Sequence, residues 1–238
     1  MLLPLIDSSI SRFDRTTIRR FNLFKAMNEE ELADVVATAQ KHKIPRGQPV
    51  FRQGDVARHF YFLLRGRLKV VQLTKDGEQI VVRIVHPGEL FGIARALRRA
   101  DYPGTAIATV ESVALAWNSD LWTEMTARCP ALAADALHMV TNHLQEMHAR
   151  VRELSTENVE RRVANTVVRL IARAGRETRD GILIDFPISR QDIAEMTGTT
   201  ISTVSRILSV WADKGLIKSG RQRIMVIEPQ LLIRLTRE

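Results

Sequence analysis

Residues 190–208, RQDIAEMTGTTISTVSRIL, decide the fold of the C-terminal part of the chain. Two short helices cross at a steep angle only when a small residue faces the partner helix, the turn accepts a positive φ, and apolar residues close the wedge. Gly198 suits the turn, because glycine adopts the left-handed conformation without a Cβ clash. The other roles fall to Ala194, Val204 and Ile207, with further core contacts from Ile193, Met196 and Leu208. The stretch therefore predicts a helix-turn-helix.

The second helix of this motif carries hydrogen-bonding side chains on the faces that do not pack. Thr199 and Thr200 offer a hydroxyl to cap its start. Beyond the cap follow Ser202, Thr203, Ser205 and Arg206. Such residue types read base edges and phosphates, so the motif predicts a DNA contact. The alternative, an ordinary helical hairpin in a larger core, would not explain this polar pattern.

The composition bounds the remaining possibilities. The chain has 238 residues, 45% of them hydrophobic and 26% charged, which is typical of a globular protein with one to two domains. The formal net charge of +8 favours a polyanionic partner. Basic residues interrupt the apolar stretch 60–73, and the N-terminus lacks a secretion signal, so we expect no membrane span and a cytoplasmic location.

Several kinds of chemistry are missing from the sequence. Cys129 is the only cysteine, which excludes disulfide frameworks, four-cysteine zinc sites and cysteine-ligated iron–sulfur clusters within one chain. No His–Cys pair, paired-carboxylate motif, phosphate-binding glycine loop or metal-ligand spacing stands out. We therefore expect no enzymatic activity, no catalytic residues and no metal site.

Short β-rich runs separated by glycine turns extend from His42 to about Asp120. Residues 75–78, KDGE, look like a hairpin turn between alternating strands. The turns are marked by Gly47, Gly54, Gly66, Gly77 and Gly88. This pattern predicts an antiparallel β-sandwich or roll, which either encloses a small ligand or simply packs its own core. Asn28 is the expected cap of a helix that precedes the roll.

A heptad pattern follows Pro130 without a glycine or proline to interrupt it. Spacings of four and three residues alternate over Ala133, Leu137, Val140, Leu144, Met147, Val151 and Leu154. This is the 3.5-residue repeat of a coiled-coil seam, and it predicts that the helix pairs with its copy in a dimer. Packing against the chain's own roll is the alternative, and both are compatible along different stretches. Arg150, Arg152 and Glu153 are expected on the solvated flanks.

The fold class predicted from these segments is α+β: an antiparallel β-roll, a long dimerisation helix and a winged helix-turn-helix. A helix from about Val159 to Ala174 opens the last part, and the run 216–229, LIKSGRQRIMVIEP, reads as two wing strands around Gly220. At the wing tip, the side chains of Arg221 and Arg223 either contact phosphate or are simply solvated charges of the turn. The expected divisions are an N-terminal arm at 1–20, the roll at 21–128, the dimer helix at 129–156 and the winged helix-turn-helix at 157–238.

This order of elements resembles the CRP/FNR family of bacterial transcription regulators over residues 21–238. In the first half the resemblance lies in LFKAMNEEEL, GQPVFRQGD, FYFLLRGRLKVVQLTKDGEQI and PGELFG; in the second it lies in FPISRQDIAEMTGTTISTVSRILSVWADKGLI. The resemblance implies a homodimer whose two recognition helices enter successive major grooves of a near-palindromic double-stranded DNA site. An activator of this kind would also contact RNA polymerase.

The resemblance also implies roles for single residues. Ser189, Arg190 and Gln191 stand where family members hold the phosphate backbone, as do Thr199 and Thr200. Arg206 matches the arginine that reads guanine. Ser202 replaces a glutamate of many members, and Ile201 replaces an arginine of the cyclic AMP branch, so the usual half-site sequence does not transfer.

The effector is left unassigned. Cyclic-nucleotide-binding members use a glutamate and an Arg-Ser pair after the PGE turn; those positions fall near Ala94 and near Tyr102-Pro103, so cyclic AMP is not expected. Arg95, Arg98 and Arg99 either hold an anion in another register or are solvated. One cysteine cannot supply the iron–sulfur cluster of the oxygen-sensing branch.

The recognition segment is nearest to the nitric-oxide and denitrification-type (DNR/NnrR-like) branches. Haem therefore remains an option, with His86, His143 and His148 as candidate ligands, although a histidine at such positions is usually just a polar residue. A further alternative is a ligand-binding regulatory module whose helix-turn-helix serves protein contacts.

Overall fold

The computed structural model describes residues 18–236 and divides into two compact units. The first contains the described residues up to Gln72 together with Arg83–Leu144, and the second contains Leu73–Val82 and everything from Gln145 onward. The arm predicted at 1–20 lies outside the described residues up to position 17. Within residues 18–236, no helix is long and apolar enough to cross a bilayer.

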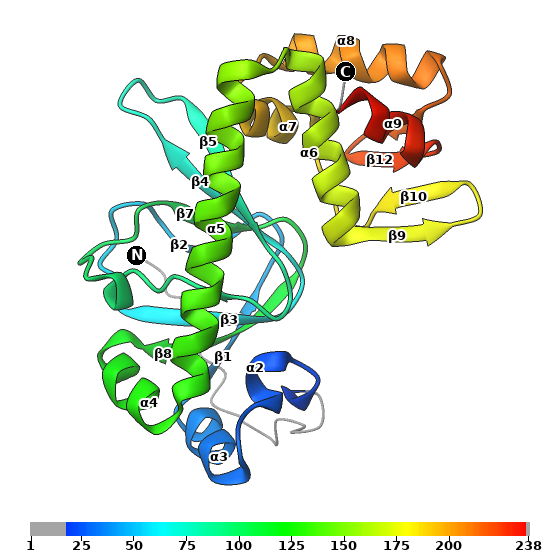
Figure 1. Cartoon of the computed structure of the whole chain (residues 1–238). Helices are drawn as coiled ribbons and strands as arrows, with labels where there is room; N and C mark the ends of the chain where they lie inside the picture. The colour runs from blue at the N-terminus through cyan, green and yellow to red at the C-terminus, as the bar shows by residue number, and fades with distance from the viewer. Residues whose placement is uncertain (1–17, 237–238) are drawn as a thin grey trace. The chain divides into compact units, whose positions relative to one another are not determined.

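Most of the first unit is an antiparallel β-roll of two four-stranded sheets (Figure 1), in which only the β4–β5 hairpin extends into the second unit, and this confirms the predicted roll. One sheet has the order β1-β8-β3-β6 and the other the order β2-β7-β4-β5. The strands are β1 (Gln40–Ile44), β2 (Pro49–Phe51), β3 (His59–Arg65), β4 (Leu68–Leu73), β5 (Gln79–Val85), β6 (Leu90–Phe91), β7 (Thr105–Ala108) and β8 (Ser112–Asn118). Short 3-10 helices, η1 (Arg95–Leu97) and η2 (Ser119–Leu121), follow β6 and β8.

Strand β3 is buried on both faces, because it separates two apolar cores. Tyr61 and Leu63 point into the interior of the roll, whereas Phe60 and Phe62 pack on the outer face of the sheet. A strand that is covered on both faces needs a continuous apolar run rather than an alternating one. This requirement explains the unbroken sequence FYFLL in this strand.

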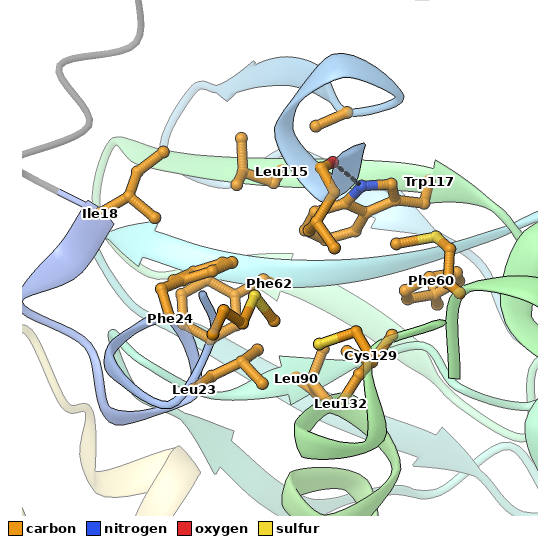
Figure 2. Close-up of a cluster of buried hydrophobic side chains, with 14 of the residues drawn as sticks. Ile18, Leu23, Phe24, Phe60, Phe62, Leu90, Leu115, Trp117, Cys129 and Leu132 are labelled. Carbon is orange, nitrogen blue, oxygen red and sulfur yellow. Dashed lines mark hydrogen bonds between the residues drawn. The ribbon is translucent and has the colours of Figure 1, made fainter. Parts of the chain in front are cut away.

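Short helices cover the outer face of this sheet: α2 (Asn22–Lys25), α3 (Glu29–Ala37) and α4 (Trp122–Arg128), together with the start of α5 (Pro130–Thr156). Figure 2 shows Phe24, Phe60 and Trp117 in this core, where the indole Nε1 of Trp117 donates to the carbonyl of Val35 at 2.8 Å. Asn28 caps α3 as predicted, and Glu31 completes the capping box.

Aromatic rings fill the interior of the roll. Phe51 stacks on Tyr102 with ring centroids 3.8 Å apart, and Tyr61 stacks on Phe91 at 5.0 Å. The Tyr102 hydroxyl donates to the carbonyl of His59 at 2.6 Å. Tyr102 is therefore a structural residue of this core.

The second unit contains the end of α5 and a four-stranded sheet of order β11-β12-β10-β9, with four helices around it (Figure 1). Its elements after α5 are α6 (Val159–Ala174), β9 (Gly175–Thr178), β10 (Gly181–Ile184), α7 (Arg190–Thr197), α8 (Ile201–Asp213), β11 (Ile217–Gly220), β12 (Arg223–Val226) and α9 (Pro229–Leu235). The predicted wing strands are β11 and β12, while β9 and α9 were not predicted. The tip of the β4–β5 hairpin belongs to this unit, where Gln79 donates to Glu195 at 3.0 Å.

The expectation that Glu153 and Arg150 are solvated is wrong. Glu153 is 9% exposed and accepts two hydrogen bonds from the guanidinium of Arg169 on α6, one of them at 3.2 Å. Arg150 is half-buried and donates to the carbonyl of Val81 at 3.0 Å. Burial lowers the pKa of Arg150. Both side chains fasten the end of α5 to neighbouring elements of its unit.

We predict that Glu153→Ala lowers the free energy of unfolding of the second unit by about 1.5–3 kcal/mol, because it leaves the half-buried Arg169 without its carboxylate partner. The control is Glu146→Ala, which removes the more exposed ion pair with Arg173 on the same two helices. That pair should contribute about 1 kcal/mol or less. Urea unfolding followed by circular dichroism measures both variants, and equal losses would contradict the assignment.

Candidate nucleic-acid interface

Helices α7 and α8 meet at a turn built on Gly198, as the sequence predicts. Gly198 ends α7 with φ 60° and ψ 48°, which is the left-handed conformation. The N–H of Thr199 then donates to the carbonyl of Ala194 at 3.1 Å. A Cβ at position 198 would lie 3.1 Å from a methyl group of Leu154, so space as well as backbone conformation favours glycine.

Side chains cap both helices at their N-termini. Ser189 and Asp192 form a capping box on α7, with the Asp192 N–H donating to Ser189 Oγ at 3.0 Å. Thr200 caps α8 and accepts from the N–H of Thr203 at 3.2 Å. The Thr200 hydroxyl also lies 2.8 Å from that of Ser202 and 2.9 Å from that of Thr203. These bonds satisfy N–H groups that a helix start otherwise leaves unpaired.

Helix α8 has one buried and one exposed face. Its buried face consists of Val204, Ile207, Leu208 and Trp211. The indole Nε1 of Trp211 donates to Glu160 on α6 at 2.8 Å, which fixes α8 on the rest of the unit. Ile201, Ser202 and Arg206 are exposed, and Ser205 is half-buried. The exposed face can therefore enter a groove while the buried face holds the helix in place.

Four exposed arginines of the helix-turn-helix and wing make no side-chain hydrogen bond or ion pair with the described part of the chain. Arg190, Arg206, Arg221 and Arg223 are exposed, and within residues 18–236 no hydrogen bond or ion pair engages their guanidinium groups. Arg176 and Lys218, in contrast, pair with Asp185 at 3.0 Å and Asp180 at 3.4 Å. The uncommitted guanidinium groups can bind phosphate or a base edge without first breaking a bond inside the protein.

The remaining predicted DNA contacts lie around the same two helices or at the wing. Gln191 is exposed and its amide donates to Glu195 at 2.9 Å, whereas Thr199 and Thr203 are half-buried. The wing turns at Gln222, which has φ 56° and accepts a hydrogen bond from the N–H of Ile188. That contact joins the β11–β12 turn to the residues immediately before α7.

Helix α5 leaves most of the predicted seam uncovered. Leu132 and Ala136 are buried in the core of the first unit. On the seam, Leu137 is 68% exposed, Leu144 54%, Val151 58% and Leu154 49%, while Val140 and Met147 are half-buried. Ala133 is exposed as well. The helix thus buries one apolar face within its own chain and presents another.

The arginine and histidine side chains considered for an effector site differ in their partners and in their exposure. Arg95 pairs with Asp120 at 2.7 Å, and Arg99 pairs with Asp101 at 3.3 Å. The Nδ1 atom of His86 contacts the guanidinium of Arg67, His143 is half-buried and His148 is exposed. Within the described residues, no group of three or more His, Cys, Asp or Glu side chains is placed to hold a metal ion.

Comparisons with known proteins agree with both halves of this architecture. Residues 41–129 match the family model of the cyclic nucleotide-binding domain, and residues 161–235 match that of the Crp-like helix-turn-helix domain. The chain is 27% identical to the cyclic AMP receptor protein of Thermus thermophilus over 88% of this chain and 94% of that one. It is also 27% identical to the global nitrogen regulator of a Nostoc species, over 90% and 94% of the two chains.

Solved structures show the same fold. A CRP-family transcriptional regulator from Thermus thermophilus matches with a TM-score of 0.70 and 26% identity, over 83% of this chain and 97% of that chain. FixK2 from Bradyrhizobium japonicum matches with a TM-score of 0.72 at 21% identity, over 83% and 96%. A cyclic-nucleotide-binding-type roll, a long helix and a Crp-like helix-turn-helix occur here in one chain and in the same order. The chain therefore has the domain organisation of CRP/FNR-type bacterial transcription regulators.

Proposed function

We propose that the protein is a homodimeric, sequence-specific regulator that places α8 of each subunit in a major groove of near-palindromic DNA. The observation that carries this proposal is the exposed face of α8, on which Arg206 has no partner among residues 18–236 while the opposite face is buried. An uncommitted arginine on such a face suits a bidentate contact with guanine O6 and N7.

The surrounding residues supply the contacts that orient α8. Ser189 caps α7, which begins with Arg190 and Gln191, and Thr199 and Thr200 directly precede α8, so both helix starts can offer N–H groups or side chains to phosphates. Arg221 and Arg223 extend the basic surface along the wing. The remaining side chains of the recognition face, Ile201, Ser202, Thr203 and Ser205, lie between these phosphate contacts and Arg206. We propose that the phosphate contacts orient α8 on the DNA while Arg206 contacts a base.

The seam on α5 supports the dimer. Full burial of a leucine or valine side chain is worth roughly 1.5–3 kcal/mol, whereas association costs roughly 4–15 kcal/mol. Four large side chains per subunit are about half exposed or more, so eight of them become available to a symmetric interface. Because only about half of each side chain remains to be buried, the gain is about 6–12 kcal/mol in all, which is comparable with the cost of association. A two-fold axis along this seam would place two copies of α8 about 34 Å apart on DNA.

We further propose that an effector other than cyclic AMP acts through the β-roll. Tyr102, at the position expected for part of the phosphate-binding pair, instead stacks in the aromatic core against Phe51. The hydrogen bond from Gln79 on the β4–β5 hairpin to Glu195 on α7 supports a path by which the roll influences DNA affinity. The named relatives include cyclic AMP and nitrogen regulators and do not support the nitric-oxide branch.

A role in protein contacts is the competing function for the helix-turn-helix. The four uncommitted arginines favour DNA, because binding through phosphates releases counterions and weakens as salt rises. Affinity for selected DNA fragments that does not fall between 50 and 200 mM salt would instead favour protein contacts.

We predict that Arg206→Ala abolishes specific binding at physiological salt and leaves the dimer intact. The site is first selected from random DNA, and the affinities for that site and for a scrambled one are then compared by fluorescence anisotropy and footprinting. Loss of a bidentate guanine contact should reduce the preference by about 5- to 150-fold in each half-site, and the dimeric variant loses this contact in both. Arg234→Ala removes the same charge from an exposed position on α9 and serves as the control. A specific footprint that survives Arg206→Ala would overturn the assignment.

We predict that Leu144→Lys converts the dimer into monomers, because a charge replaces a seam side chain that is already 54% exposed in the single subunit. The monomer fold should be unaffected for the same reason. Sedimentation velocity measures the oligomeric state, and circular dichroism measures the fold. Gln145→Lys, at an exposed position outside the seam, should remain dimeric. A dimeric Leu144→Lys variant would contradict the proposed interface.

A further inference from the structure

The exposed face of α8 is bounded by two chemically different side chains. At about 100° per residue, positions 201, 205, 209, 202 and 206 follow one another over an arc of about 140°. Ile201 lies at one edge of this arc and Arg206 at the other, with Ser202, Ser205 and Ser209 between them. The small serines leave room for the helix to approach a surface closely. The arc therefore has an apolar edge and a cationic edge.

Ile201 is not a core residue of the helix-turn-helix. Its side chain is 49% exposed, whereas Val204 and Leu208 on the neighbouring face are fully buried. It is the first residue of α8, directly after the cap formed by Thr200. Packing within the chain thus leaves about half of its surface uncovered.

The position of Ile201 restricts what its exposed surface can contact. The N-terminal residues of a recognition helix are those that reach base edges in the major groove. Among the groups displayed there, only the C5-methyl group of thymine is apolar. An isoleucine side chain gains from contact with that methyl, because both surfaces leave water together, but it offers no hydrogen bond to a guanine, adenine or cytosine edge.

We infer that Ile201 is a specificity-determining residue that reads the methyl group of a thymine in each half-site. The inference rests on the proposed DNA-binding function. Ile201 and Arg206 are five residues apart, or about 7.5 Å along the helix axis, so this thymine lies within about three base pairs of the guanine contacted by Arg206. Each half-site therefore has one position chosen by a methyl contact and one chosen by hydrogen bonds.

The test replaces each thymine of the selected site, one position at a time, by deoxyuridine, which lacks only the C5-methyl group. With the wild-type protein, one thymine per half-site should show a loss of affinity of about fourfold, the value of one buried methyl-sized group. With Ile201→Ala, the affinity for the unmodified site should fall by at least as much, and the difference between thymine and deoxyuridine should vanish at that position alone.

The control is Val210→Ala, which truncates another exposed apolar residue of α8 outside the arc. This variant should keep the full thymine preference. If wild-type protein shows no preference for any selected site, the proposed DNA-binding function fails. If it binds specifically but every deoxyuridine is tolerated, or the thymine preference persists in Ile201→Ala, only the assignment of Ile201 is overturned.

Discussion

The main constraint on the structure is that helix α5 carries two separate apolar faces. One apolar face, through Leu132 and Ala136, completes the core under the first sheet. A second face, through Leu137, Leu144 and Val151, is left exposed over the length of the helix. In a monomer this exposed stripe on a 27-residue helix contributes no hydrophobic stabilisation, because apolar side chains stabilise a structure only when they are removed from water. In the proposed dimer, this second face is the interface.

The elements that the sequence predicts well are those specified by local chemistry. The turn at Gly198, the caps at Asn28 and Thr200, and the heptad spacing of α5 each depend on residues within one or two turns of one another. Alternation and glycine turns likewise suffice for the roll. Tertiary partners are not encoded in this way. The position of Glu153 in the heptad pattern does not show that Arg169 on the next helix will pair with it and cover it. The sequence pattern therefore predicts a solvated side chain at this position.

The same reasoning separates the site residues into two groups. Hydroxyls at the helix starts are already engaged, since Thr200 and Ser189 hold the first turns of α8 and α7. Their contribution to a phosphate contact is therefore to fix the geometry of the helix N-terminus, whose N–H groups attract anions. The side chain of Arg206, in contrast, makes no hydrogen bond or ion pair with residues 18–236. Only the structure makes this distinction, because the sequence gives both groups the same hydrogen-bonding character.

The proposed dimer compensates for the small number of base contacts that one copy of α8 offers. On the proposed mode of binding, a single recognition face discriminates through one arginine and one apolar contact, with three serines between them. A bidentate contact is worth about 1–3 kcal/mol, whereas a genome offers about 10⁶–10⁹ competing sites. Two faces held in fixed register double the discrimination in free energy and thereby square the preference. In this proposal the exposed seam of α5 is as necessary for specificity as the recognition helix itself, because a single helix-turn-helix of this composition contacts too few bases to find its site.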